Sequence, residues 1–178
     1  MLELMKKIIF TLLMLTFINC QKENEVDVIS STDIDLITGI EMTNIYGVKE
    51  YRIGNPNVLS NGLLIYPNPI KGIIGIMSLE GVKITDFWIL KGYPKKLFQD
   101  IDFDKVLSSD LYTENELNNK ALKRKSDLEN YNIYINLEDF ETGHYRVFIK
   151  VDGKIKWDNF YILNEKESPL DLLDNFWK

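Results

Sequence analysis

The chain carries one histidine, His144, and one cysteine, Cys20, so few side chains are available for acid–base or nucleophilic chemistry. His144 would be the general base of any such site, and Arg146 and Lys150 share its face of a strand, where their charge favours the neutral imidazole. No serine or cysteine nucleophile lies close to His144 in the sequence. We therefore expect an exposed strand histidine, no cofactor and no enzymatic activity.

Three carboxylates alternate with apolar residues at Asp100, Asp102 and Asp104. On a strand they would share one face and could contribute to a Ca²⁺ site, which needs about 6–8 oxygen ligands. The glycine and the later glutamate of a helix–loop–helix calcium loop are missing. Because Ile101 and Phe103 stand between the carboxylates, we expect the solvated acidic face of a half-buried strand and no metal site.

Aromatic and basic residues suggest two kinds of binding surface. Trp88, Trp157 and Trp177 could stack on sugar rings, although aromatic residues at strand spacing usually belong to a core. The basic run at 120–125 is expected to be a solvated loop, with contact to an acidic partner as the alternative. The net charge of -6 argues against nucleic acid as a partner, because phosphate binding needs clustered basic residues.

The first twenty residues have the build of a secretory signal. Lys6 and Lys7 precede an apolar run at 8–18, which is too short to span ~30 Å of hydrocarbon as a permanent helix. The apolar run ends at a cysteine, and not at the small-x-small pattern that marks the cleavage site of an ordinary signal peptide. We expect residues 1–19 to be a signal peptide and residues 20–33 to be a polar tether.

The segment Phe17-Ile18-Asn19-Cys20 resembles the lipobox of bacterial lipoproteins. The resemblance implies cleavage between Asn19 and Cys20, a diacylglycerol thioether on Cys20, and acyl chains such as palmitate that anchor the protein in a lipid bilayer. Phe17 and Asn19 stand where the lipobox prefers Leu and a small residue. An ordinary signal peptide, or an uncleaved anchor, is the alternative interpretation.

The residues that follow Cys20 are polar and charged. Residues 21–25 resemble the short acidic export signal that sends Bacteroidetes lipoproteins to the outer face of the outer membrane. The resemblance implies a lipid-anchored protein of the outer membrane in the cell envelope, with the cell surface favoured over the periplasmic face. A plain hydrophilic tether would explain the same residues.

Short apolar runs separated by Gly, Pro and Asn predict an all-β fold over residues 34–163. The expected strands are Leu36–Asn44, Leu63–Tyr66, Gly72–Leu79, Val82–Leu90, and further strands after residue 130. Residues 95–130 are expected to form a polar excursion with one or two helical turns. Residues 164–178 are expected to form a short amphipathic helix with Ser168 as its N-cap.

The clearest alternation begins at Tyr131. Asn132, Tyr134 and Asn136 are expected to share the outer face of one strand, and Asp152-Gly153 is expected to form a tight hairpin turn. After this turn Ile155 and Trp157 are expected to point inward, with Phe160 and Ile162 out of phase. A β-bulge near residues 158–159 would absorb the change of phase.

The motif Tyr66-Pro67-Asn68-Pro69, together with residues 137–145, resembles the C-terminal sorting domain of type IX secretion substrates. The resemblance implies an immunoglobulin-like β-sandwich of about seven strands and a Bacteroidetes source. Here the similar region forms nearly the whole chain, and a lipobox is unusual on such a substrate. We therefore take from the resemblance the fold, and not the secretion role.

The sequence as a whole predicts a membrane-anchored bacterial lipoprotein whose sandwich serves binding or assembly. The expected partners are the lipid bilayer, through acylated Cys20, and a protein of the cell envelope. A carbohydrate-binding accessory lipoprotein that uses exposed aromatic residues is the alternative.

Overall fold

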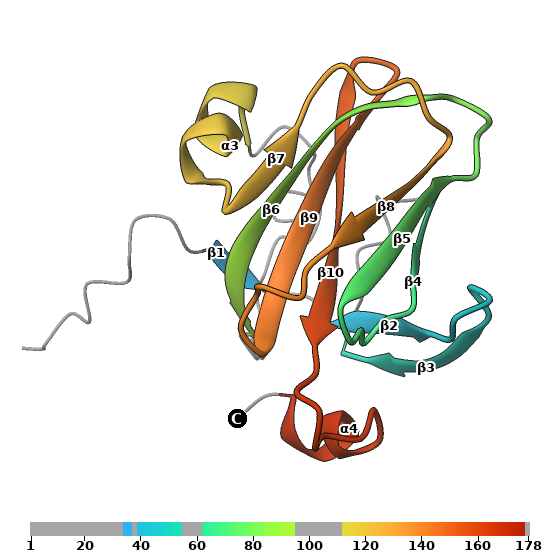
Figure 1. The fold of residues 1–178 in the computed structure, drawn as a ribbon, viewed down its shortest axis with the longest axis vertical. Coiled ribbons are helices and arrows are strands. Elements are labelled where there is room, and N and C mark those ends of the chain that lie inside the picture. The colour runs from blue at the N-terminus through green and yellow to red at the C-terminus, as the bar shows by residue number, and fades with distance from the viewer. Residues whose placement is uncertain (1–33, 37–38, 55–61, 95–111, 177–178) are drawn as a thin grey trace, which may run out of the picture.

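Two sheets face each other across an apolar core in the computed structural model, which describes residues 34–36, 39–54, 62–94 and 112–176 (Figure 1). The larger sheet comprises β1 (Ile34–Leu36), β6 (Ile84–Pro94), β7 (Lys123–Lys125), β9 (Gly143–Val151) and β10 (Lys154–Ile162), in the order β1–β6–β9–β10 with β7 beside β6. The smaller sheet comprises β4 (Leu63–Tyr66), β5 (Ile73–Ser78) and β8 (Asn132–Asn136), in that order.

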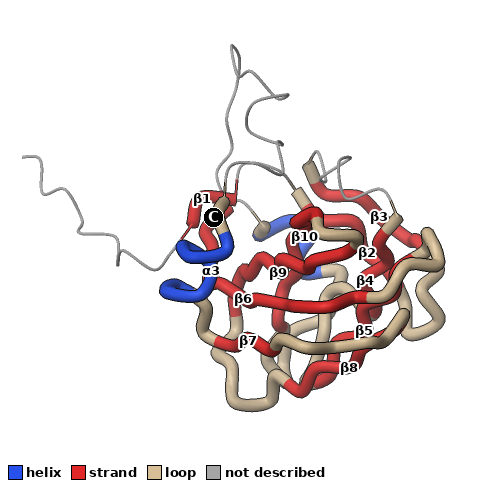
Figure 2. The backbone as a smooth tube through the Cα atoms, turned by 90° about the horizontal axis from the view of Figure 1, so that it is seen from above, coloured by secondary structure: helices blue, strands red, loops and turns tan. Residues whose placement is uncertain are grey.

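A two-stranded hairpin of β2 (Ile40–Thr43) and β3 (Lys49–Ile53) crosses one end of the sandwich, where helix α4 (Asp171–Asn175) also lies (Figure 1). Helix α3 (Glu114–Lys120) lies on the side of the larger sheet that faces away from the smaller one (Figure 2). The described strands pair antiparallel, apart from β1 with β6. The fold is an immunoglobulin-like β-sandwich, which confirms the predicted class, and the described residues form ten strands where about seven were expected.

The corner before β9 carries a feature typical of such sandwiches. The Tyr145 hydroxyl donates a hydrogen bond of 2.8 Å to the carbonyl of Glu141, four residues upstream. The Tyr145 ring is buried and stacks on Phe160, with 5.6 Å between ring centroids. Immunoglobulin-like folds close this corner with a tyrosine in the same way. The Asp152-Gly153 turn that follows β9 has positive φ at both residues, as the sequence predicted.

The larger sheet is apolar on both faces. The inner face and the smaller sheet share one core, made of Ile65, Ile74, Ile76, Phe87, Ile89, Ile133, Ile135, Val147, Ile149 and Phe160 among others. The outer face and α3 share a second core, made of Trp88, Leu90, Leu117, Phe148 and Trp157. Strand residues that alternate toward the outer face are therefore buried as well.

This second core corrects the interpretation of β10. Strand β10 pairs with β9 without a break in register from Lys154 to Ile162, so the expected bulge near residues 158–159 is wrong. Ile155 and Trp157 face the outer core, whereas Phe160 and Ile162 face the inner core. The apolar residues change face along a regular strand, because each half of β10 is covered on a different side.

The excursion before β8 contains the short helix that the sequence predicted. Thr113 caps α3, since its side chain accepts from the Glu116 backbone while the Glu116 carboxylate accepts from the Thr113 backbone. Leu117 is fully buried, and Asn118 accepts a 2.8 Å hydrogen bond from the Trp88 indole. The basic run is not wholly a loop, because Lys123–Lys125 form β7 on the edge of the larger sheet.

Helix α4 covers the hairpin. Leu172 and Phe176 pack on Ile40, Met42 and Ile53 in a third, smaller core. The helix begins later than expected: the Ser168 hydroxyl accepts from the Leu170 backbone at 3.2 Å, which closes the turn before the helix rather than capping it. β2 and Ile53 are therefore buried against α4, whereas the other residues of β3 remain exposed.

The Asn68 side chain joins β2 to the sandwich. Asn68 is buried, and its amide nitrogen donates to the carbonyls of Glu41 and Asn159, at 3.0 Å each. Its amide oxygen accepts from the Tyr161 backbone at 3.2 Å. Its own backbone exchanges two hydrogen bonds with Thr43, of 2.8 and 3.0 Å. The Tyr66-Pro67-Asn68-Pro69 turn, whose two X–Pro peptide bonds are cis, thus contacts both β2 and β10.

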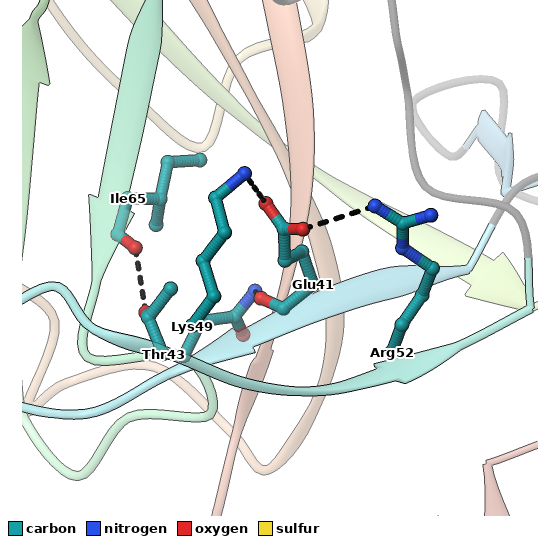
Figure 3. Close-up of polar contacts among 6 residues, drawn as sticks. Glu41, Thr43, Lys49, Arg52 and Ile65 are labelled. Atoms are coloured by element: carbon teal, nitrogen blue, oxygen red, sulfur yellow. Dashed lines mark hydrogen bonds and ion pairs between the residues drawn. The ribbon is translucent and has the colours of Figure 1, made fainter.

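Three further contacts fix the hairpin (Figure 3). The Thr43 hydroxyl donates to the Ile65 carbonyl on β4 at 2.7 Å. The Glu41 carboxylate binds Lys49 at 2.7 Å and Arg52 at 3.2 Å, both from β3. Burial works to raise the pKa of Glu41, but the hydrogen bonds from these two cations outweigh it and leave the pKa below its ordinary value.

A second buried amide, that of Asn159, repeats the arrangement. Its oxygen accepts from the Arg146 guanidinium at 2.8 Å, and its nitrogen donates to the Gly39 carbonyl at 3.1 Å. Gly39 accommodates no side chain, since an added Cβ would lie 1.4 Å from the Ile53 carbonyl oxygen. Arg146 stacks on Trp157, 3.6 Å from the ring centroid, and burial lowers its pKa to about 10. The start of β2 is thereby tied to the interior of the larger sheet.

Candidate functional site

The residues that the sequence singled out for chemistry divide into two groups. Asn19 and Cys20 lie outside the described residues, and so do the three carboxylates at positions 100, 102 and 104. The turn Tyr66–Pro69 lies inside them, and its Asn68 is engaged in the structural hydrogen bonds given above. Within this turn Tyr66 and Pro67 are partly exposed, whereas Asn68 and Pro69 are buried.

His144 is not an exposed strand residue as expected. Its ring lies between Tyr161 and Phe176, each 4.7 Å away between centroids and edge-on. Burial lowers the pKa of His144 to about 4, against a smaller opposing effect from a hydrogen bond with the Phe176 backbone. His144 therefore serves as a neutral, mostly buried contact between β9 and the C-terminal segment.

The tryptophans do not form the sugar-stacking platform considered above. Trp88 and Trp157 are both 1% exposed and belong to the outer core under α3, and Trp177 lies outside the described residues. The exposed aromatic residues of the described chain are tyrosines instead, among them Tyr134 at 67% exposure. A stacking surface on this domain would thus have to be built from tyrosine.

The outer face of the smaller sheet gathers such residues, and we call it the tyrosine face. Strand pairing aligns Tyr66, Gly75 and Tyr134 in one row across β4, β5 and β8. The outward positions of the three strands are Leu64, Tyr66, Ile73, Gly75, Met77, Asn132, Tyr134 and Asn136. None of these positions is charged, although 27% of the chain is.

Gly75 allows the row to close. The distal half of the Tyr66 ring lies above Gly75, where an added Cβ would be 2.7 Å from the ring carbon that bears the hydroxyl. The Tyr66 hydroxyl thereby crosses β5 and reaches β8, where it lies 3.1 Å from the Tyr134 hydroxyl and donates to Asn132 at 3.2 Å. The Asn132 amide donates to both hydroxyls, at 2.9 and 3.1 Å.

The two phenols are electrostatically distinct. Burial, together with its hydrogen bond to Tyr134, raises the pKa of Tyr66. The pKa of Tyr134 is lowered by its hydrogen bonds with Tyr66 and, to a smaller extent, with Asn132. The two rings meet edge to face at 84°, with centroids 6.3 Å apart. The cluster therefore presents two differently oriented rings held by a shared polar network.

Two hollows lie elsewhere, on either side of Phe140. One, of about 410 Å³, is lined by Lys71, Glu138 and Glu165 among others, and the Lys71 ammonium binds the Glu165 carbonyl at 3.2 Å. The other, of about 270 Å³, is rimmed by Lys91 and Glu141, which form a 3.0 Å ion pair. These basic groups are engaged at the rims and do not converge on the interior of either hollow.

The sequence contained part of the signal for the tyrosine face. Its alternation placed Asn132, Tyr134 and Asn136 together on an outer face, and the structure confirms this. The sequence did not reveal that Tyr66 lies across Gly75, because that depends on the pairing of β4 with β5. Tyr66 was noted only as the first residue of the turn motif.

Comparisons with known proteins add little to this picture. No known protein family matches the chain, and no curated protein does. A solved structure of a DUF3244-family protein with an immunoglobulin-like β-sandwich fold, from Bacteroides vulgatus, aligns with a TM-score of 0.35 and 8% sequence identity. The alignment covers 71% of this chain and 98% of that one. A similarity this low says nothing about function.

The described residues also bear on metal sites and on membrane-spanning helices. Within them, no three His, Cys, Asp or Glu side chains lie together in a way that could hold a metal ion. Neither of the helices in that part of the chain has the length and apolarity that crossing a membrane requires. The tyrosine face, with its exposed Tyr134 and its shared hydroxyl network, is the surface that we consider for function.

The buried His144 makes stability depend on pH in a specific direction. Its pKa of about 4 in the folded chain lies below the ordinary 6.5, so the unfolded chain binds the proton first as the pH falls. The neutral, buried imidazole contributes fully to the free energy of unfolding above pH 6.5, and this contribution is lost as the pH falls toward 4.

The free energy of unfolding, measured with urea, should fall between pH 7 and pH 4.5 in the wild type. In His144→Leu it should fall by about 2 kcal/mol less. An equal loss in both proteins would show that His144 titrates normally.

Proposed function

We propose that this chain is a membrane-anchored bacterial lipoprotein, held by a lipid on Cys20, whose sandwich binds a component of the cell envelope through the tyrosine face. The anchor is supported by the sequence alone: a charged and apolar leader ends at the one cysteine of the chain. A single thiol has no disulfide partner within the chain, which leaves it available for a thioether. The binding role is supported by the tyrosine face.

The composition of the tyrosine face is the observation that carries the binding role. Tyr134 and Ile73 are 67% and 50% exposed, and Asn136 is exposed beside them. Exposed tyrosines with neighbouring amides are characteristic of binding surfaces, because a tyrosine offers a large, rigid contact area with a polar tip at little cost in conformational entropy. A face without charge also loses little solvation when a partner covers it.

Both faces of the larger sheet are covered, which is why we assign binding to the tyrosine face. The outer face of the larger sheet is covered by α3, and its inner face is covered by the smaller sheet. At the end of the sandwich, α4 covers the hairpin only at Ile40, Met42 and Ile53, and the rest of β3 is exposed. No helix or strand of the described residues covers the outer face of the smaller sheet, and the β2–β3 turn meets it only at Leu64, where Gly47 contacts the side chain. This face therefore offers a sheet surface on which a partner could lie.

The anchor predicts selective acylation. Cells that express the wild-type chain and are fed an alkyne fatty acid should incorporate the label into this protein, because Cys20 carries the lipid. Cys20→Ala should stay unlabelled at equal protein abundance, since it removes the only thiol of the chain. Equal labelling of both proteins would contradict acylation at Cys20.

The binding role predicts protection of Tyr134 in living cells. Hydroxyl-radical footprinting, read by mass spectrometry, should modify Tyr134 severalfold less in cells in their growth medium than in the purified protein. Tyr51, which is 52% exposed on β3, provides a matched tyrosine outside the tyrosine face and should be modified equally in both. Equal modification of Tyr134 in cells and in solution would contradict a partner at this face.

A further inference from the structure

We propose that Tyr66, Asn132 and Tyr134 bind a neutral saccharide. This inference rests on the proposed binding role of the tyrosine face and names the chemical class of its ligand. It follows from three properties of the face: its lack of charge, the arrangement of its rings and hydroxyls, and its size.

The lack of charge restricts the ligand first. The eight outward positions hold apolar, phenol and amide side chains and glycine, and none can pair with an ionic group. Two charged groups flank the face at Asn136 and are already engaged there: Glu138 accepts from the Asn136 amide at 3.1 Å, and Lys123 donates to the Asn136 carbonyl at 2.6 Å. An ionic ligand would lose solvation here without gaining a counter-charge. The face therefore favours a neutral ligand over a nucleic acid, an acidic polysaccharide or a charged peptide.

The rings suit the two kinds of surface that a pyranose presents. A pyranose has an apolar face of C–H groups, which packs against an aromatic ring, and a rim of hydroxyls. Tyr134 stands exposed, while the Tyr66 ring reaches across Gly75 and meets it at 84°. A sugar ring that packs on Tyr134 would therefore also contact Tyr66 at its edge.

The polar groups of the cluster suit sugar hydroxyls. The 3.1 Å contact between the two phenol oxygens permits either one to be the donor. The phenol hydroxyls of the cluster can consequently offer either a donor or an acceptor to solvent. A sugar hydroxyl can pair with either one, because it both donates and accepts hydrogen bonds. The amide of Asn132 is held in place by both tyrosines, at 2.9 and 3.1 Å, so these groups are ordered before a ligand arrives.

The area of the tyrosine face favours a saccharide over a protein partner. Three strands spaced about 4.8 Å apart, with some five residues each at about 3.3 Å, present roughly 200–300 Å². A stable protein interface needs about 800 Å² from each partner. The tyrosine face alone therefore matches a short oligosaccharide better than a folded protein.

The test is binding of the full purified protein to a panel of neutral gluco-, manno- and xylo-oligosaccharides and of acidic oligogalacturonides. At least one neutral probe should bind, and Tyr134→Ala should weaken that binding about tenfold. Gly75→Ala should weaken it similarly, because the new methyl displaces the Tyr66 ring. Tyr134→Phe, which keeps the ring, should retain more affinity than Tyr134→Ala.

Two control variants keep the test specific. Tyr51→Ala removes an exposed tyrosine from β3. Gly81→Ala strains a turn in which φ is +68°, but its methyl has no atom within 4 Å and displaces no ring. Both should bind the neutral probe as the wild type does. The inference is overturned if no neutral probe binds, if only the acidic probes bind, or if Tyr134→Ala binds as well as the wild type. Protection of Tyr134 in cells without any glycan binding would leave the binding role standing and overturn only the saccharide.

Discussion

The arrangement of this domain depends on one buried amide. Asn68 makes hydrogen bonds to Glu41, Asn159 and Tyr161, so a single side chain fixes the positions of β2, β10 and the turn that follows β4. Buried amides are costly unless each polar atom finds a partner, and here the partners come from separate parts of the chain. The hairpin, and with it the small core under α4, can form only where this amide places them. The Tyr-Pro-Asn-Pro motif is thus a structural joint of the sandwich.

The same joint organises what is left exposed. With the hairpin and α4 closing one end, and α3 covering the larger sheet, the apolar side chains of the larger sheet are buried on both faces. The smaller sheet is covered on its inner face, and its outer face meets the β2–β3 turn only at Leu64. Tyr66 belongs to both the Asn68 turn and the tyrosine face. It begins the turn that holds Asn68, and its ring lies across Gly75 to meet Asn132 and Tyr134. The rigidity of the joint therefore supports the geometry of the tyrosine face.

Much of the fold could be predicted from local patterns. Alternation and turn chemistry were enough to predict the sandwich class, the Asp152-Gly153 turn, strand β4 and the outward row of Asn132, Tyr134 and Asn136.

The predictions that failed depended on contacts between distant parts of the chain. Ile155 and Trp157 were assigned to the inner face of β10, because the sequence of the strand does not show that α3 covers its outer face. His144 was expected to be exposed, because the C-terminal residues that bury it lie over thirty positions away. The joint at Asn68 was recognised as a turn, but its partners were not visible in the sequence.

The role of Asn68 as the joint can be measured directly with Asn68→Ala. Urea unfolding should show a loss of about 3 kcal/mol, because carbonyl and amide groups that are buried in the wild type lose their partner. Amide hydrogen exchange should show the largest loss of protection in β2, with less in the β9 ladder. Asn136→Ala, which removes an exposed amide, should cost less than about 1 kcal/mol. A loss in Asn68→Ala no greater than in Asn136→Ala, with β2 as protected as before, would contradict the account.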